Sequence, residues 1–230
     1  MTLAPPVLSF ARAGAVPAPA EVRDLVIAGW TGRDTAAMEH HIAELAALGV
    51  PRPAATPCFY RVAASLLTQA PAIQVVGPDS SGEVEFFIYQ DDTTRWLGVG
   101  SDHTDRKLEA YNVTLSKQAC AKPIGTTLWR FDEVAAHWDQ LVLRAYATID
   151  GARTLYQEGP VTTMRAPDDL LARYAASGGA FNSGTMMFCG TLGVQGGVRP
   201  ADRFDIALHD PVLDRTITHT YAVETLPNVG

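Results

Sequence analysis

The sequence has little cysteine. Its 230 residues include only Cys58, Cys120 and Cys189, and no two of them form a C-x-x-C pair. A zinc knuckle or a dithiol redox pair is therefore not indicated, and an odd number of cysteines argues against the disulfide framework of a secreted domain. We expect all three thiols to lie in the core as small apolar side chains.

Other absences restrict the class of function. No apolar run approaches the roughly 18 residues that a membrane span needs, and the N-terminal segment does not resemble a signal peptide. Lysine and arginine (18) are outnumbered by aspartate and glutamate (25), and the net charge of −7 does not support nucleic-acid binding. No G-x-G-x-x-G follows a predicted strand, which argues against a dinucleotide fold. We expect a cytoplasmic protein with neither a membrane nor a nucleic-acid partner.

The sequence does contain many short strand patterns and few helices. Asp34 is a good N-cap for an amphipathic helix that Gly49 would end. Further helices are predicted over 132–145 and 166–177, and Pro/Ala-rich residues between the first two strands predict a turn. Period-two or β-rich segments predict strands over 8–10, 23–29, 72–77, 82–89, 95–101, 145–150, 154–159, 185–194, 203–210 and 216–226. Runs of strands with few inserted helices indicate an α+β protein with a mixed or antiparallel sheet.

The segment Gly82–Ile88 carries the sharpest chemical signal. On a strand, Glu83 and Glu85 point to one face and Val84 to the other. Two carboxylates this close repel each other unless a cation lies between them, and hard oxygen ligands favour Mg²⁺, Mn²⁺ or Ca²⁺ over zinc. A solvated strand face is the alternative, although glutamate is disfavoured in strands.

A second signal is the polar loop Ser101–Arg106, which follows a predicted strand. Asp102 is a candidate metal ligand, and His103 is a candidate ligand or acid–base group. A lone histidine in a polar loop more often supports a ligand residue from behind it or is solvated. The same loop has the composition of a helix N-cap ahead of residues 106–111. The two interpretations are compatible.

Two weaker signals flank these. His41 and Glu44 lie one helical turn apart, so the carboxylate could orient the imidazole as a general base. A surface ion pair is the alternative. Lys117 could hold a substrate oxygen near a metal. A Ser116–Lys117 nucleophilic dyad is not expected, since adjacent residues on a strand point to opposite faces.

In this order the segments resemble the fumarylacetoacetate hydrolase superfamily. Its motifs are H-x-x-E, a proline-rich F-x-K segment, E-x-E, N-D-x-S-x-R, a lysine and G-T-P-x-G-V. They match His41 and Glu44, residues 53–61, Glu83 and Glu85, residues 101–106, Lys117 and residues 190–194. This sequence departs from the pattern in having Arg61 for the F-x-K lysine, Leu192 for the late proline, and His103 and Asp105 in the acidic loop.

The resemblance implies a mixed β-sheet roll with a few peripheral helices. Residues 1–70 would be a small N-terminal segment with a lid-like helix, and residues 71–230 the catalytic roll. The resemblance also implies that Mg²⁺ or Mn²⁺ binds to Glu83, Glu85 and Asp102. It further implies that His41 and Glu44 activate water and that Lys117 is catalytic. Residues expected to bind substrate are Arg61, His103, Arg106 and Thr191.

The expected activity is that of a metal-dependent hydrolase or lyase acting on a small 2-oxo acid, an acylpyruvate or a diketone-like anion. An isomerase or hydratase with the same site, or a non-catalytic metal- or ligand-binding domain, is the alternative. The resemblance also implies a homodimer.

Overall fold

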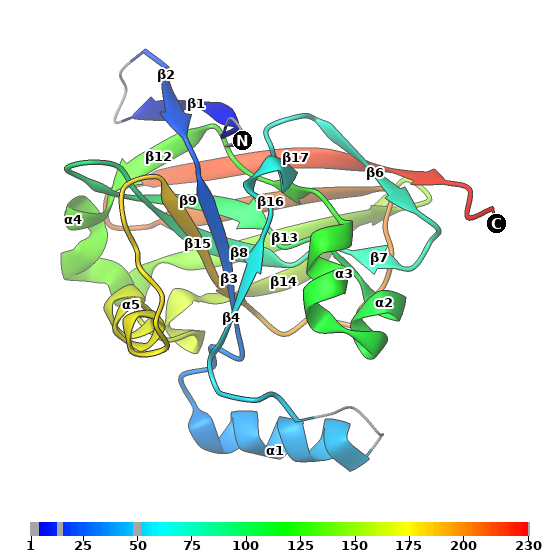
Figure 1. Cartoon of the computed structure of the whole chain (residues 1–230). Helices are drawn as coiled ribbons and strands as arrows, with labels where there is room; N and C mark the ends of the chain where they lie inside the picture. The colour runs from blue at the N-terminus through cyan, green and yellow to red at the C-terminus, as the bar shows by residue number, and fades with distance from the viewer. Residues whose placement is uncertain (1–4, 13–15, 48–51, 230) are drawn as a thin grey trace.

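The structure is a computed structural model that describes residues 5–12, 16–47 and 52–229 (Figure 1). Within the first helix, the side chains of residues 41 and 44–47 also lie outside the description. Two sheets make up most of the chain.

The larger sheet has eight strands, and β8 and β9 lie near its centre. Its members in sheet order are β2 (Ala18–Glu21), β1 (Val7–Arg12), β12 (Thr127–Arg130), β9 (Arg95–Ser101), β8 (Val84–Gln90), β15 (Thr185–Thr191), β3 (Asp24–Gly29) and β4 (Cys58–Val62). The β1–β12 and β3–β15 pairs are parallel and the other pairs are antiparallel. Strands from both sides of residue 70 therefore share one sheet.

The smaller sheet has five strands and packs against the larger one (Figure 1). Its order is β14 (Ala152–Pro160), β13 (Val142–Ile149), β16 (Arg203–Asp210), β17 (Arg215–Leu226) and β6 (Ala72–Val76). Two short pairs complete the strands: β5 (Leu67–Thr68) with β11 (Lys122–Pro123), and β7 (Ser80–Ser81) with β10 (Thr104–Asp105). The predicted α+β class with mixed sheets is confirmed.

Alternation along the central strands separates two apolar clusters, one on each face of the large sheet. Val84, Phe86 and Ile88 of β8 belong to the cluster that includes Leu143 and Phe204 of the small sheet. Phe87 and Tyr89 belong to the other cluster, with Phe188 of β15. Because β8 is buried on both faces, a carboxylate on it is removed from water unless the site itself admits solvent.

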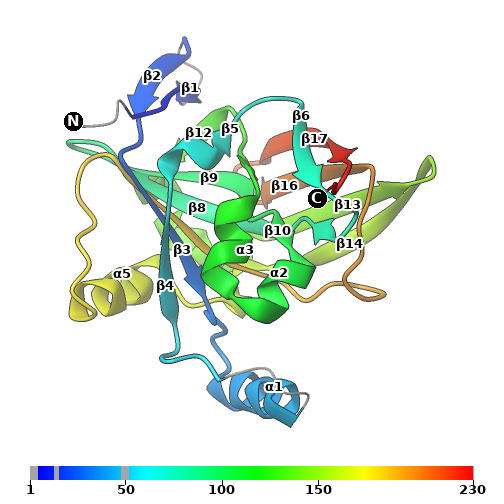
Figure 2. The same ribbon diagram turned by 45° about the vertical axis from the view of Figure 1, so that its right-hand side comes forward.

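The helices lie at the periphery. They are α1 (Thr35–Ala47), α2 (Arg106–Tyr111), α3 (Val113–Ala119), α4 (Phe131–Val134) and α5 (Pro167–Ala176), with short 3₁₀ turns over Ala64–Leu66, Ala135–Gln140 and Val161–Thr163. Figures 1 and 2 show α1 apart from both sheets, beyond the ends of β3 and β4, and α2 and α3 side by side. Both α2 and α3 pack against β10, and α3 also packs against β4. None of the helices in the described part of the chain combines the length and apolar character needed to cross a bilayer.

Several sequence-based predictions of elements are confirmed and others are wrong. The Asp34 carboxylate accepts hydrogen bonds from the amides of Ala36 and Ala37, as an N-cap does. Gly49 lies outside the described residues. The helix predicted over 132–145 ends at Gln140 instead, because Val142–Ile149 pairs with strands on both sides. The Pro/Ala-rich turn contains strand β2, and Lys117 lies on helix α3 rather than on a strand.

The cysteine prediction holds for two of three residues. Cys120 and Cys189 are buried, while Cys58 is half-buried at the start of β4. All three are free thiols.

Candidate metal centre

Three carboxylates converge where β8 and β9 meet their flanking residues. Glu85 lies opposite Gly100 in the antiparallel pair. Glu83 and Asp102 flank the same pair, and the Asp102 amide donates a 3.0 Å hydrogen bond to the Glu83 carbonyl. One oxygen from each of Glu83, Glu85 and Asp102 lies within 4.8 Å of the others. We call these three residues the acidic cluster.

The acidic cluster is largely removed from solvent. Asp102 is fully buried and Glu85 is 2% exposed, whereas the Glu83 side chain is 17% exposed. Burial raises the pKa of Glu85 well above its ordinary value, and the charges of Asp102 and Glu83 raise it further. A hydrogen bond of 2.7 Å from the Gly190 amide to Oε2 opposes this shift and fixes the carboxylate.

Two lysines face Asp102. Lys117 of α3 forms an ion pair with Oδ2, and the Lys122 Nζ lies 3.1 Å from Oδ1. Although burial alone would raise the pKa of Asp102, the charges of Lys117 and Lys122 lower it to about 2. Asp102 is therefore a fixed anion at neutral pH.

Arg106, the first residue of α2, holds Glu83. Its Nη1 donates to Glu83 Oε1 at 3.0 Å and to Glu109 Oε2 at 2.9 Å. Its Nε donates to Ser81 Oγ at 2.7 Å. The helix begins here because the Asp105 side chain caps it, accepting from the Leu108 amide, so the N-cap interpretation of this loop is confirmed.

The acidic cluster fits a hard divalent cation. All three donors are carboxylate oxygens, the ligand type that Mg²⁺, Mn²⁺ and Ca²⁺ prefer. Asp102 Oδ1 is buried and accepts no well-directed hydrogen bond, despite its nearby lysine. A buried carboxylate with one oxygen that lacks a directed hydrogen bond, held beside two further carboxylates, is an arrangement that a cation would complete.

His103 is separated from the acidic cluster by its hydrogen bonds. It is fully buried, with Nδ1 3.1 Å from the Tyr221 hydroxyl and Nε2 2.9 Å from Ser80 Oγ. Both ring nitrogens are thus engaged between β17 and β7, and neither is left to meet a substrate. Burial and then the charges of Lys122 and Arg106 lower its pKa to about 3.

This burial predicts a pH effect on stability. Between pH 6.5 and about 3, the unfolded chain binds a proton at His103 that the folded protein does not. Protonation of the unfolded chain therefore lowers the free energy of unfolding as the pH falls below 6.5, by up to about 1.4 kcal/mol per pH unit. Above pH 6.5 this loss is absent. Urea unfolding in EDTA should therefore show a flatter pH dependence for His103→Gln than for the parent. Equal slopes for His103→Gln and the parent would contradict the prediction.

Arg61 lies on the other face of the large sheet. Residues paired across neighbouring strands point to the same face of a sheet. Tyr60 pairs with Ile27, and Ile27 with Phe188. Phe188 in turn pairs with Phe87, which points to the same face as Glu85. Arg61 is one residue further on, so it points to the opposite face and pairs with Asp24. The residue of this segment that shares the face of the acidic cluster is therefore Tyr60.

Thr191 forms hydrogen bonds that hold the start of β8 in place. Its hydroxyl donates to the Val84 carbonyl at 2.8 Å and accepts from Gln157 Nε2 at 2.8 Å. The buried Gln157 also accepts from the Val84 amide at 2.9 Å and donates to the Leu192 carbonyl at 2.6 Å. These bonds tie the start of β8 to the turn after β15, and hence position Glu83 and Glu85.

Position 190 requires glycine, because both the backbone conformation and the neighbouring atoms exclude a side chain. Its φ is +101°, and an added Cβ would lie 1.8 Å from Thr31 Oγ1. Gly190→Ala should therefore lower the free energy of unfolding by about 2–4 kcal/mol through backbone strain and overpacking. Gly193→Ala, where an added Cβ meets nothing within 4 Å, should change it by less than about 0.5 kcal/mol. Denaturant titration of both variants checks this, and equal stabilities would contradict it.

Sequence reasoning missed Lys122, Gln157, Tyr60 and Tyr221. Lys122 follows Lys117 by five residues in the sequence, but only the fold brings both lysines to Asp102. The side chains of His41 and Glu44 lie outside the described residues, and only their place on α1 is known. Their predicted role remains a prediction.

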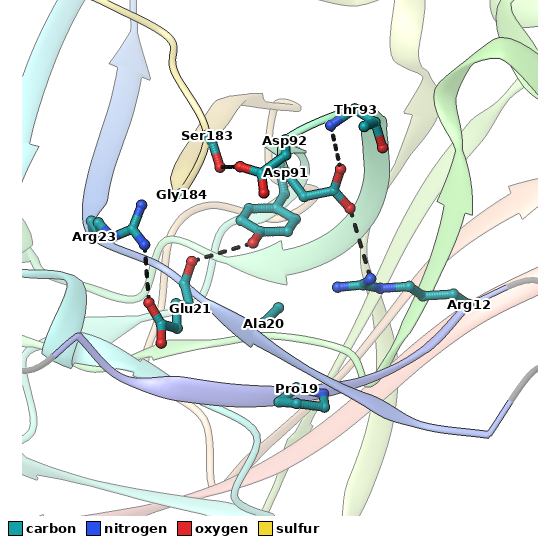
Figure 3. Close-up of a pocket in the computed structure, with 11 residues that line it drawn as sticks. Arg12, Pro19, Ala20, Glu21, Arg23, Asp91, Asp92, Thr93, Ser183 and Gly184 are labelled. Atoms are coloured by element: carbon teal, nitrogen blue, oxygen red, sulfur yellow. Dashed lines mark hydrogen bonds and ion pairs between the residues drawn. The ribbon is translucent and has the colours of Figure 1, made fainter.

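A polar cavity of about 410 Å³ lies away from the acidic cluster, between the β1–β2 hairpin and the turn after β8 (Figure 3). Its charged side chains pair with each other: Arg12 with Asp91, and Arg23 with Glu21. Ser183 donates to Asp92. A second cavity of about 490 Å³ borders the acidic cluster through Arg106.

Comparison with known proteins agrees with this architecture. Residues 28–221 match the family described as protein of unknown function (DUF2848). The chain belongs to the DUF2848 family. A search of curated proteins finds no match to this DUF2848 protein.

Solved structures share the fold of this DUF2848 protein. A protein described as a fumarylacetoacetate isomerase/hydrolase, from Oleispira antarctica, aligns with a TM-score of 0.67 at 17% identity, covering 93% of this chain and 98% of that one. A fumarylacetoacetate hydrolase family protein from Yersinia pestis CO92 aligns at 0.64 and 18%, covering 94% and 99%. A 2-keto-3-deoxy-D-arabinonate dehydratase complexed with magnesium and 2,5-dioxopentanoate aligns at 0.61 and 15%, covering 92% and 77%. The predicted fumarylacetoacetate hydrolase fold is confirmed.

Proposed function

We propose that this DUF2848 protein is a divalent-metal-dependent hydrolase or lyase acting on a small 2-oxo acid, acylpyruvate or diketone-like anion. The observation that carries the proposal is the acidic cluster. One oxygen from each of three carboxylates on and beside one strand pair lies within 4.8 Å of the others, and one oxygen of the buried Asp102 lacks a directed hydrogen bond. We assign Mg²⁺ or Mn²⁺ to this site, with Ca²⁺ as a further candidate of the same ligand preference.

When bound, the cation would supply Lewis acidity that stabilises negative charge on substrate oxygens. The protein's own groups supply the rest. Arg106 orients Glu83, and the Gly190 amide orients Glu85. Lys117 and Lys122 keep Asp102 ionised. Preorganised charges of this kind act strongly because the surrounding strands exclude water.

The surroundings of the acidic cluster suit a small anion. The Lys117 ammonium lies beside Asp102 and Glu83, and the neighbouring cavity is lined by Arg106, Lys107 and Arg199 against only Asp79 and Glu109. This local excess of positive charge contrasts with the net charge of −7 and would draw anions toward the site. Arg106 both donates a hydrogen bond to Glu83 and lines this cavity, so it could contact an anion bound there.

Lyase chemistry has its own support. The magnesium-bound dehydratase with this fold carries a dioxo acid as its ligand. Hydrolysis would in addition require an activated water, for which we propose His41 and Glu44 of α1. An isomerase or hydratase using the same acidic cluster, and a non-catalytic metal-binding domain, are the competing functions.

A substrate panel tests the proposal. Acylpyruvates, oxaloacetate, 2-oxo-pent-4-enoate-like acids and related lactones should be incubated with the protein in Mg²⁺, in Mn²⁺ and in EDTA. We expect turnover of at least one 2-oxo acid that EDTA abolishes and added metal restores. Turnover unaffected by EDTA would overturn the metal assignment, and metal binding without turnover would favour the binding-domain alternative.

We also propose that the protein is a homodimer, as the resemblance implies. Sedimentation should give about twice the 24.7 kDa mass of the chain. A species of 24.7 kDa alone would contradict it.

A further inference from the structure

Two of the chain's three lysines meet at one buried carboxylate. The only lysines are Lys107, Lys117 and Lys122, and the latter two both contact Asp102. A single fixed anion does not require two ammonium groups, so the two lysines need separate explanations.

Lys122 is a permanent partner of Asp102. It is fully buried on β11, and its Nζ also donates a 2.7 Å hydrogen bond to the His103 carbonyl. With this second bond and no exposed surface, the ammonium has no alternative position. It continues to neutralise Asp102 whatever else enters the site.

Lys117 is placed differently. Its Nζ contacts Asp102 Oδ2 and lies 3.8 Å from Glu83 Oε2, so one ammonium spans two of the three carboxylates. A cation bound by the acidic cluster would have to contact carboxylate oxygens that the Lys117 ammonium now contacts. An ammonium and a divalent cation cannot share those oxygens, because like charges a few ångströms apart repel strongly in a buried site.

A second resting place for Lys117 lies next to it. The Tyr60 ring is on the same face of the sheet as Glu85, and its centroid is 5.9 Å from Lys117 Nζ. An aromatic face attracts an ammonium at this distance. Lys117 is 6% exposed on helix α3 and has a flexible four-carbon stem.

We propose that Lys117 is an internal counter-ion of the acidic cluster that the incoming metal displaces. In the metal-free protein its ammonium neutralises Asp102 and Glu83. A divalent cation takes over those oxygens, and Lys117 moves onto the Tyr60 ring, where it faces the anionic substrate. This inference rests on the proposed metal site and adds a built-in competitor that weakens metal affinity while stabilising the metal-free fold.

The test measures Mn²⁺ binding directly, by electron paramagnetic resonance and by calorimetry. Lys117→Met removes the competing charge while Lys122 still pairs with Asp102, so Mn²⁺ should bind about ten-fold or more tightly. In EDTA the same variant should melt at a lower temperature than the parent. Lys107→Met, at the one remaining lysine, is exposed and should leave both readings at the parental values.

Two further variants secure the result. Lys117→Gln keeps a hydrogen-bond donor, so it should fold if Lys117→Met does not, and it should also bind Mn²⁺ more tightly. Tyr60→Leu removes the ring and should weaken Mn²⁺ binding about two- to five-fold. An unchanged or weaker Mn²⁺ affinity in both Lys117 variants would overturn the counter-ion, while the metal site would stand. No binding by the parent or by either Lys117 variant would instead overturn the metal site itself.

Discussion

Asp102→Asn should abolish the stabilisation of the protein by Mg²⁺ or Mn²⁺ and destabilise the metal-free fold as well. Asp102 is fully buried and is the common partner of Lys117 and Lys122. Removing its charge leaves the enclosed Lys122 ammonium with only the His103 carbonyl. Breaking a buried pair from one side costs about 3–5 kcal/mol.

The metal effect is separate and can be measured on the same variant. At a metal concentration about 100 times Kd, the parent should gain about 2.7 kcal/mol of stability. Asp102→Asn should gain none, and Glu83→Ala and Glu85→Ala should likewise fail to respond. Asp132→Asn is the control, because that aspartate forms an exposed pair with Arg130. Unfolding in EDTA and in metal gives both quantities, and a parental metal response in Glu83→Ala would show that the ligand assignment is wrong.

His41→Ala should lower kcat on a confirmed substrate by about 10²–10⁴-fold if the protein is a hydrolase, the usual contribution of a general base. Glu44→Gln should lower it less, since the carboxylate would only orient the imidazole. Neither change should alter Mn²⁺ affinity, because the acidic cluster is built from β8, β9 and their flanking residues, not from α1.

His40→Ala is the matched control, one position along the same helix and exposed. It should keep the parental kcat. Near-normal turnover by His41→Ala would exclude the His41–Glu44 pair as the water-activating group. Decarboxylation or isomerisation would then replace hydrolysis as the reaction, with the acidic cluster unchanged.

The acidic cluster could be predicted because its ligands are close in sequence. Glu83 and Glu85 are separated by one residue, and a short hairpin brings Asp102 back to the same end of the strand pair. Strand periodicity placed Glu83 and Glu85 on one face, and the resemblance to the fumarylacetoacetate hydrolase superfamily supplied Asp102 as the third ligand. Arg106 followed from the same loop, as the first residue of the helix that Asp105 caps.

Arg61 and His103 show the limit of such reasoning. A strand residue faces one side or the other according to the pairing register, and a shift of one residue exchanges the two faces. Sequence spacing could not decide that Tyr60, rather than Arg61, shares the face of Glu85. Nor could it show that β17 supplies Tyr221, 118 residues away, as a partner for His103.

The sequence by itself determined the mixed-sheet class, the helix after Asp34 and the pairing of Glu83 with Glu85, because these depend on periodicity. The family resemblance of its motifs added Asp102. Only the tertiary structure decided which charges surround those carboxylates. Lys122 from β11 and Lys117 from α3 reach Asp102, and the Gly190 amide of β15 reaches Glu85, so all three come from elements outside the β8–β9 pair. Which distant segments meet at a buried carboxylate depends on how the sheets pack, and no local pattern encodes that packing.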